Sequence, residues 1–231
     1  MGCLLKPNGL YTRLRIGAVL LAAGEGRRMG GVAKPLIRLQ GVPLISRQLV
    51  ALSGAGVDEV VIVTGHAREA IEAQVQTFPV TLAHNEAYRD GQPGSVRVGL
   101  AALSGPFDAV LVALADQPMI GADDLTELIS AFKKRPAGHV VVPRVTPAGA
   151  LPGQGRRGNP IVLDATAQRE ILLGPTRLGC RQFIESHPEL VHVHETTNAR
   201  FITDLDTLDD VEQLARRTGW RLELPARVAT A

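Results

Sequence analysis

An uninterrupted apolar run at Ile16–Leu21 is followed within a few residues by a glycine-rich stretch, Gly24 to Gly31. A run without alternating polar residues is typical of a strand that is buried on both faces of a parallel sheet. Glycines directly after such a strand let the backbone approach a ligand closely, because they carry no Cβ and can adopt positive φ. Their N–H groups can then converge on phosphate oxygens. The stretch predicts an α/β fold with a phosphate-binding loop, although an ordinary turn can have the same composition.

Two basic residues, Arg28 and Lys34, accompany these glycines. Their positive charges suit the phosphates of a nucleoside triphosphate, and surface cations on a turn are the alternative. The spacing is not that of the common phosphate motifs. It lacks the Gly-Lys-Ser/Thr of a P-loop and the Gly-x-Gly-x-x-Gly that opens a helix in dinucleotide-binding folds. The glycines and cations alone therefore leave both interpretations open.

Length and composition indicate one large domain. The chain has 231 residues and is 45% hydrophobic, which is enough for a full α/β core. A net charge of +2 with scattered basic residues gives no electrostatic case for binding nucleic acid or a membrane. Cys3 and Cys180 lie far apart without a zinc-binding spacing, which indicates a reduced, cytoplasmic setting. We expect a flexible extension at residues 1–15, a single domain at 16–217 and a C-terminal tail at 218–231.

The most hydrophobic run, Ala109–Ala115, predicts the central strand of the sheet, and Asp116 follows it directly. Ligands bind outside the carboxyl ends of strands in open α/β sheets. A carboxylate at this position suits Mg²⁺, which usually binds through one or two carboxylates together with substrate phosphates. A solvated turn is the alternative for Asp116 alone, but the upstream glycine-rich stretch favours the metal.

The remaining pattern alternates between strands and helices. Short apolar runs predict strands at 60–64, 80–83, 140–142 and 191–195, and helical periodicity predicts helices near 43–55, 95–103, 122–132, 164–173, 177–185 and 206–217. Ser95 is expected to cap the helix that begins there. The loop before it should face the glycine-rich stretch across the carboxyl edge of the sheet. His66 also follows a strand, although a lone histidine there is more often a surface residue.

Leu21 to Gly30, with Lys34 after it, closely resembles the signature Leu-Ala-Ala-Gly-x-x-x-Arg-Met-Gly and following lysine of Rossmann-like nucleotidyltransferases. Within them the chain resembles the molybdenum cofactor cytidylyltransferase branch of the MobA-like NTP transferase family. Further family motifs occur in the same order. They are an Asn, aromatic, Gly, Ser pattern at 85–95, Asp-Gln-Pro at 116–118, Gly-Asn-Pro at 158–160 in place of Gly-His-Pro, and an acidic element at 204–210.

This resemblance implies a mainly parallel sheet with helices on both faces, as in nucleotide-diphospho-sugar transferases. It implies Mg²⁺-dependent transfer of CMP from CTP to molybdopterin, with release of pyrophosphate. The pair Ala22-Ala23 is similar to the cytidylyl branch, because the guanylyl branch tends to carry glycine at the second position. Guanylyl transfer, another phosphorylated acceptor and a nucleotide-binding module without turnover remain the alternatives.

The resemblance also implies residue roles. Arg28, Lys34 and Asp116 would be catalytic, and Asp116 and Asp206 would contact the metal, with Asp206 preferred to Asp204. Nucleotide-binding roles are implied for Leu21, Ala22, Ala23, Gly24, Gly26, Arg28, Lys34, His66, Asn85, Gly91 and Ser95.

Acceptor-binding roles are implied for Asn159 and Arg181. Asn159 stands where the family usually has histidine, so hydrogen bonding is kept but no acid–base role is implied. Arg181 can alternatively solvate one face of its helix. A molybdoenzyme or its chaperone is the implied protein partner.

Overall fold

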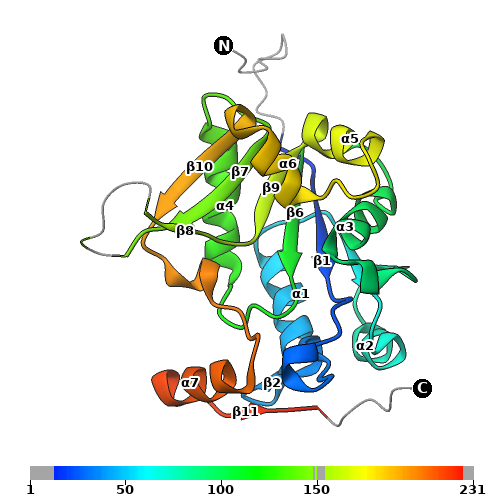
Figure 1. Ribbon diagram of the computed structural model, residues 1–231, viewed down its shortest axis with the longest axis vertical. Helices are drawn as coiled ribbons and strands as arrows, with labels where there is room; N and C mark the ends of the chain where they lie inside the picture. The colour runs from blue at the N-terminus through cyan, green and yellow to red at the C-terminus, as the bar shows by residue number, and fades with distance from the viewer. Residues whose placement is uncertain (1–12, 148, 150–153, 226–231) are drawn as a thin grey trace.

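A central sheet with the strand order β10-β7-β9-β6-β1-β4-β5 organises the chain (Figure 1). The computed structural model describes residues 13–147, 149 and 154–225, so most of the extension expected at 1–15 lies outside the described residues. The strands are β1 (Ile16–Leu21), β4 (Glu59–Thr64), β5 (Thr81–His84), β6 (Ala109–Leu114), β7 (Val140–Val145), β9 (Ile161–Asp164) and β10 (Val191–Thr196), and β8 (Arg156–Arg157) pairs with β7.

The two long apolar runs form adjacent strands in the middle of this sheet. β1 pairs in parallel with β6 on one side and with β4 on the other. β10 with β7 and β4 with β5 are also parallel, whereas β9 runs antiparallel to both β6 and β7. The sheet is therefore mainly parallel, as the sequence predicts. The prediction lacks β9, because a run of three apolar residues is too short to show a period.

Helices cover both faces of the sheet (Figure 1). One face carries α3 (Gln92–Ala101), α5 (Ala165–Leu173) and α6 (Cys180–Ser186), which share a buried apolar cluster with β1 and β6. The other face carries α1 (Leu44–Gly54), α2 (Arg68–Val75) and α4 (Ala122–Lys134). The prediction lacks α2, whose buried face consists of Ile71 and Val75 only.

The expectation that Ser95 caps a helix is wrong. Helix α3 begins at Gln92, and Gly91 precedes it with a φ of 111°. Pro93 lies in the first turn, where its missing N–H leaves no helical hydrogen bond unmade. Ser95 is therefore inside the helix and buried, and its hydroxyl accepts a hydrogen bond of 3.0 Å from Nδ2 of Asn85.

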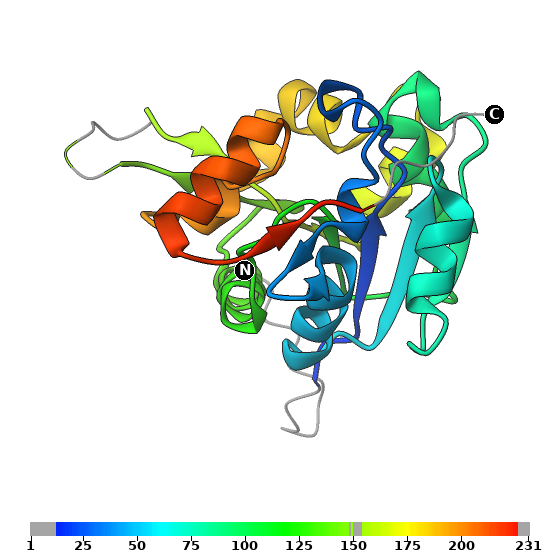
Figure 2. The same ribbon diagram turned by 90° about the horizontal axis from the view of Figure 1, so that it is seen from below.

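The C-terminal part folds back beside the glycine-rich stretch. Helix α7 (Leu208–Thr218) buries Val211 and Leu214 in a cluster that includes Met29 and Val32. β11 (Leu222–Glu223) then pairs antiparallel with β2 (Arg38–Leu39), which pairs with β3 (Val42–Pro43) (Figure 2). Part of the segment expected as a tail is thus a strand that lies against the N-terminal half.

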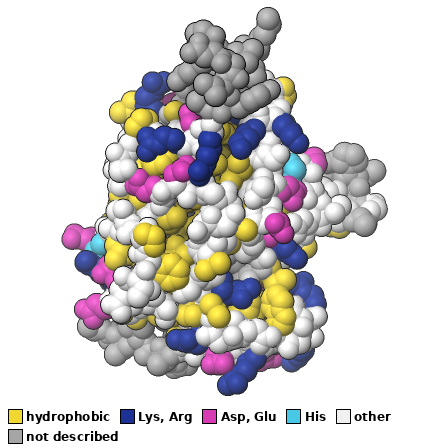
Figure 3. Space-filling model, turned by 180° about the vertical axis from the view of Figure 1, so that it is seen from behind, with side chains coloured by type: hydrophobic (Ala, Val, Ile, Leu, Met, Phe, Trp, Pro, Cys, Tyr) yellow, Lys and Arg dark blue, Asp and Glu magenta, His cyan; other side chains and the backbone are white. Residues whose placement is uncertain are grey.

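The charged surface is mixed in sign. Figure 3 shows basic and acidic side chains interspersed over the face seen from behind, in keeping with the net charge of +2. Over the described residues, the structure contains no helix with the length and apolar character needed to cross a membrane.

Close packing of α3 on the sheet provides a test of the fold. A Cβ at Gly99 would overlap Val19 and lie 2.8 Å from Cγ2 of Val63. We therefore expect Gly99→Ala to destabilise the protein by about 1–3 kcal/mol through overpacking. Urea unfolding measures this change. Gly105→Ala is the control, because a Cβ there meets open space, and equal effects of the two substitutions would contradict the packing of α3.

Candidate active site

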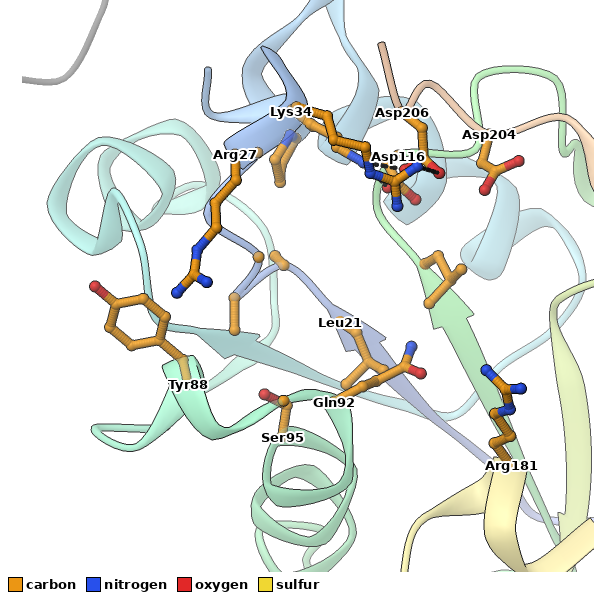
Figure 4. Close-up of a pocket in the computed structure, with 18 residues that line it drawn as sticks. Leu21, Arg27, Lys34, Tyr88, Gln92, Ser95, Asp116, Arg181, Asp204 and Asp206 are labelled. Atoms are coloured by element: carbon orange, nitrogen blue, oxygen red, sulfur yellow. Dashed lines mark hydrogen bonds and ion pairs between the residues drawn. The ribbon is translucent and has the colours of Figure 1, made fainter. Parts of the chain in front are cut away.

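A cavity of about 710 Å³ opens at the carboxyl ends of β1 and β6 (Figure 4). Its walls come from the glycine-rich stretch, the start of α3, the end of β6, α6 and the segment before α7. The lining residues are Leu21, Ala22, Ala23, Gly24, Gly26, Arg27, Arg28, Lys34, Pro35, Tyr88, Gly91, Gln92, Ser95, Leu114, Asp116, Arg181, Asp204 and Asp206. The structure thus gathers most of the residues predicted for the nucleotide and the metal around one space.

The glycine-rich stretch turns sharply at the mouth of this cavity. Gly26 and Gly30 adopt φ values of 60° and 65°, on either side of a single 3₁₀ turn at Arg27–Met29. The Gly26 carbonyl accepts hydrogen bonds from the N–H groups of Met29 at 2.8 Å and Gly31 at 3.1 Å. A Cβ on Gly26 would run into the carbonyl group of Val32. Position 26 therefore requires glycine both for its φ and for its space.

The Lys34 ammonium joins the glycine-rich side of the cavity to its acidic side (Figure 4). Nζ lies 2.9 Å from Oδ2 of Asp116 and 2.6 Å from Oδ1 of Asp206. Arg28 Nη1 lies 2.9 Å from the other oxygen of Asp206. The N–H of Leu205 donates a 3.1 Å hydrogen bond to the Asp116 carbonyl, which fixes the segment before α7 to the end of β6. The Lys34 side chain is only 15% exposed, so its two ion pairs are partly shielded from water, whereas Arg28 is exposed.

The charges of this centre shift each other's protonation. Burial disfavours the charged form of Lys34, but Asp116 and Asp206 raise its pKa overall. Burial likewise opposes ionisation of Asp206, and Lys34 and Arg28 reverse this effect and lower its pKa. Asp204 behaves differently, because burial and then the charges of Asp206 and Asp116 raise its pKa. Lys34 and Asp206 thus form a stable ion pair at neutral pH, next to a carboxyl that resists ionisation.

The donor set at this centre suits a divalent cation that takes its remaining oxygen ligands from a bound substrate. Oδ1 of Asp116 is buried and has no hydrogen-bond partner, so an oxygen donor is left free beside the cavity. Across residues 13–147, 149 and 154–225, no group of three or more His, Cys, Asp or Glu side chains is placed to hold a metal ion. Asp116 and Asp206 could hold Mg²⁺ with triphosphate oxygens completing its shell. When bound, the ion would neutralise charge that develops on the phosphates.

Three predicted site residues lie outside the lining of this cavity. The His66 ring nitrogen Nε2 is 3.2 Å from the Gly31 carbonyl oxygen, so the His66 side chain contacts the end of the glycine-rich stretch. Asn85 is buried, its side-chain Nδ2 donates to the Ser95 hydroxyl, and its side-chain Oδ1 accepts from the N–H of Ala87 at 3.1 Å. Asn159 lines a neighbouring cavity of about 280 Å³, together with Arg181, which lines both cavities.

Some lining residues are absent from the sequence prediction. Tyr88 packs against Gly65, where an added Cβ would lie 2.6 Å from the Tyr88 Cβ. Its place between Asn85 and Gly91 fits the aromatic position of the family pattern, which was a usable signal. Leu114 ends β6 just before Asp116, so its place at the carboxyl edge could also have been inferred. Gln92 is not predicted, because the sequence pattern indicates a helix that begins at Ser95, whereas α3 begins at Gln92.

The fold and this site define an α/β protein with a glycine-rich, charged cavity at the carboxyl edge of a mainly parallel sheet. The chain matches the MobA-like NTP transferase domain over residues 18–192. It therefore belongs to that nucleotidyltransferase family.

Known proteins similar to the chain include both named enzymes and solved structures. Nicotine blue oxidoreductase of Paenarthrobacter nicotinovorans is 28% identical over 200 residues, which cover 86% of this chain and 96% of that protein. A nucleotidyl transferase from Methanothermobacter superposes with a TM-score of 0.69 at 25% identity, covering 88% of this chain and 97% of that one. A Mycobacterium tuberculosis protein solved as a manganese complex has a TM-score of 0.67 at 23% identity, covering 87% and 98% of the two chains.

The raised pKa of Asp204 predicts a pH-dependent gain from neutralising this residue. A carboxyl whose pKa is higher in the folded than in the unfolded state destabilises the fold when ionised. This cost is fully present above the folded pKa, and it disappears below the unfolded value of about 3.8. We expect Asp204→Asn to raise the free energy of unfolding at neutral pH, with a gain that shrinks as the pH falls through the acid range. Urea unfolding at several pH values measures it, with exposed Asp90→Asn as control. A gain that grows on acidification would contradict the assignment.

Proposed function

We propose that this protein is a Mg²⁺-dependent nucleotidyltransferase that transfers CMP from CTP to molybdopterin and releases pyrophosphate. The observation that carries the proposal is the Lys34 ammonium held between Asp116 and Asp206, beside the turn at Gly26. This arrangement offers cations and backbone N–H groups to a triphosphate and carboxylates to its metal. Membership of the MobA-like NTP transferase family supports nucleotidyl transfer as the class of reaction. The resemblance of Ala22-Ala23 to the cytidylyl branch supports CTP.

The reaction needs no nucleophile from the protein. A phosphate oxygen of the acceptor forms a bond to the α-phosphorus of the triphosphate. The bond from that phosphorus to the oxygen that bridges to the β-phosphate breaks, and pyrophosphate leaves with the electron pair. In this proposal, Lys34 and Arg28 balance the negative charge, and the backbone from Ala23 to Gly26 orients the phosphates. Positioning and electrostatic stabilisation supply most of the catalysis in such a site.

The acceptor would enter from the side of Arg181 and Asn159. These two residues line the cavity of about 280 Å³ next to the main one, together with apolar side chains such as Val112 and Ile161. A different phosphorylated acceptor would leave the chemistry unchanged.

The similarity to nicotine blue oxidoreductase favours a second candidate, a redox reaction in the same cavity, because that relative is matched over 96% of its length. The two candidates differ in the products. Pyrophosphate release with each of the four triphosphates, with and without molybdopterin, tests transfer. A separate assay, in which a reduced nicotinamide dinucleotide is the electron donor and nicotine blue the electron acceptor, tests the redox reaction.

Asp116 should be essential for turnover. Asp116→Asn keeps the shape of the side chain but removes the charge that would hold the metal. We expect kcat to fall by about a thousandfold, which corresponds to about 4 kcal/mol of lost charge stabilisation. Pyrophosphate release with CTP, Mg²⁺ and molybdopterin measures this loss, and circular dichroism checks the fold. Asp123→Asn, on the exposed first turn of α4, should keep the wild-type rate. Full activity of Asp116→Asn would remove Asp116 from the proposed metal site.

Ala23 should contribute to the choice of base. Its methyl group faces the strand end at Gly65, where an added Cβ would lie 2.9 Å away, next to Tyr88. Removing it enlarges the pocket, so we expect Ala23→Gly to shift the kcat/KM ratio toward GTP by about tenfold, within the 1–3 kcal/mol typical of such a group. Ala113→Gly is the matched control, because the Ala113 side chain packs in the cluster on the other face of the sheet and does not line the active-site cavity. A wild-type enzyme that prefers GTP would exclude the cytidylyl assignment and leave nucleotidyl transfer standing.

A further inference from the structure

The active-site cavity continues into two outer cavities along the sheet. It shares Gln92, Leu114 and Arg181 with the cavity of about 280 Å³. That cavity shares Val142, Arg157 and Ile184 with a third, of about 330 Å³, which reaches Val191 and Val193 of β10. We call the two outer cavities together the β10 trough. The trough gives the active site a long extension on the side away from the glycine-rich stretch.

The trough has an apolar floor. Val112, Val142 and Ile161 come from the sheet, and Ile184 comes from α6. Hydroxyl groups pressed against such a floor would lose hydrogen bonds to water without gaining others. The floor therefore disfavours a polyhydroxylated sugar and favours a molecule with an apolar or flat aromatic body.

A pair of arginines stands at the rim of this floor. Nη2 of Arg157, from β8, lies 2.9 Å from Oε1 of Glu185, and Nε of Arg181, from α6, lies 3.0 Å from the same oxygen. The Glu185 oxygen thus marks a position where two guanidinium groups converge on one anionic oxygen. Arg157 lines the outer cavities and not the active-site cavity. A ligand group held at this position is therefore separate from the phosphate that reacts near Asp116.

The carboxylate of Glu185 is easy to replace there. The side chains of Arg157, Glu185 and Arg181 are 42%, 47% and 81% exposed. Ion pairs at such exposure contribute only about 0–1 kcal/mol. A ligand anion that also gains apolar contact with the floor can therefore compete with Glu185 for both arginines.

We propose that the acceptor is an elongated molecule with an apolar or aromatic body that lies along the β10 trough, and that it carries a second anionic group that Arg157 and Arg181 bind in place of Glu185. This inference rests on the proposed nucleotidyl transfer and defines the chemical class of its acceptor. Glu185 is then a competitor for the ligand's anionic group, and Arg157 is a specificity residue that the family motifs do not include.

The probe for this site is naphthalene-1-sulfonate, which joins a flat apolar body to an anionic group and is a poor phosphate acceptor. Calorimetric titration in the presence of saturating CTP keeps the active-site cavity filled. Wild-type protein should bind the probe more tightly than sulfate, which lacks the body, and than naphthalene-1-sulfonamide, which lacks the charge. Arg157→Gln and Arg181→Gln should each weaken binding about tenfold, as expected for a lost hydrogen bond to a charged group.

Glu185→Gln gives the sharpest test, because it predicts a gain. Removing the competing charge should tighten probe binding about two- to fivefold, the range expected for an exposed ion pair. Misfolding cannot produce such a gain. The matched controls are Arg216→Gln and Glu212→Gln in α7, a pair with the same i, i+4 spacing as Arg181 and Glu185 and with exposures of 77% and 63%. Both controls should leave probe binding unchanged.

The outcomes separate this inference from the proposed function. Unchanged or weaker probe binding by Glu185→Gln, or effects of Arg157→Gln and Arg181→Gln no larger than that of Arg216→Gln, would overturn the trough assignment, even if CTP binds and is turned over. Failure to bind CTP with Mg²⁺ would overturn the proposed function, whatever the probe does.

Discussion

The ion pairs of Lys34 are the interaction on which the rest of the site depends. The three charged residues come from distant parts of the chain, since Lys34 is separated by 82 residues from Asp116 and by 172 residues from Asp206. The lysine follows the glycine-rich stretch, Asp116 ends the central strand, and Asp206 precedes α7. One partly buried ammonium thus fixes three segments relative to each other, and the hydrogen bond from Leu205 to Asp116 adds a backbone tie.

The apolar packing behind this centre supports the same arrangement. Met29 and Val32 of the glycine-rich stretch are buried against Val211 and Leu214 of α7. Helix α7 is itself held by the capping interaction between Thr207 and Asp210 and by the pairing of β11 with β2. The loop that would hold phosphates is therefore part of a small core of its own, and the last helix places Asp206 while it supports that loop.

The sequence was informative wherever a local pattern determines the structure. Continuous apolar runs located β1 and β6, and the rule that ligands bind at the carboxyl ends of strands brought Asp116 and the glycine-rich stretch to one edge. Short elements such as β9 and α2 lack enough apolar residues to show a period. The predicted start of α3 is too late, because Ser95 is a residue type that commonly caps helices. Pro93, which suits the first turn of a helix, is the signal that indicates the earlier start. The shared partner of Arg157 and Arg181 could not be predicted, because it depends on how β8 and α6 meet in three dimensions.

The charge balance of the site explains why a nucleotide and its metal would bind together. Asp116 and Asp206 form ion pairs with Lys34, and Asp206 also pairs with Arg28. Burial and then the charges of Asp206 and Asp116 raise the pKa of the neighbouring Asp204. A triphosphate alone would add several negative charges next to these carboxylates. A divalent cation alone would find few free oxygens, because Lys34 and Arg28 already bind both oxygens of Asp206. Each ligand supplies what the other lacks, since the phosphates complete the oxygen shell of the metal and the metal cancels the charge of the phosphates. If the proposed nucleotide and metal bind here, this arrangement of charged side chains favours binding of the two together.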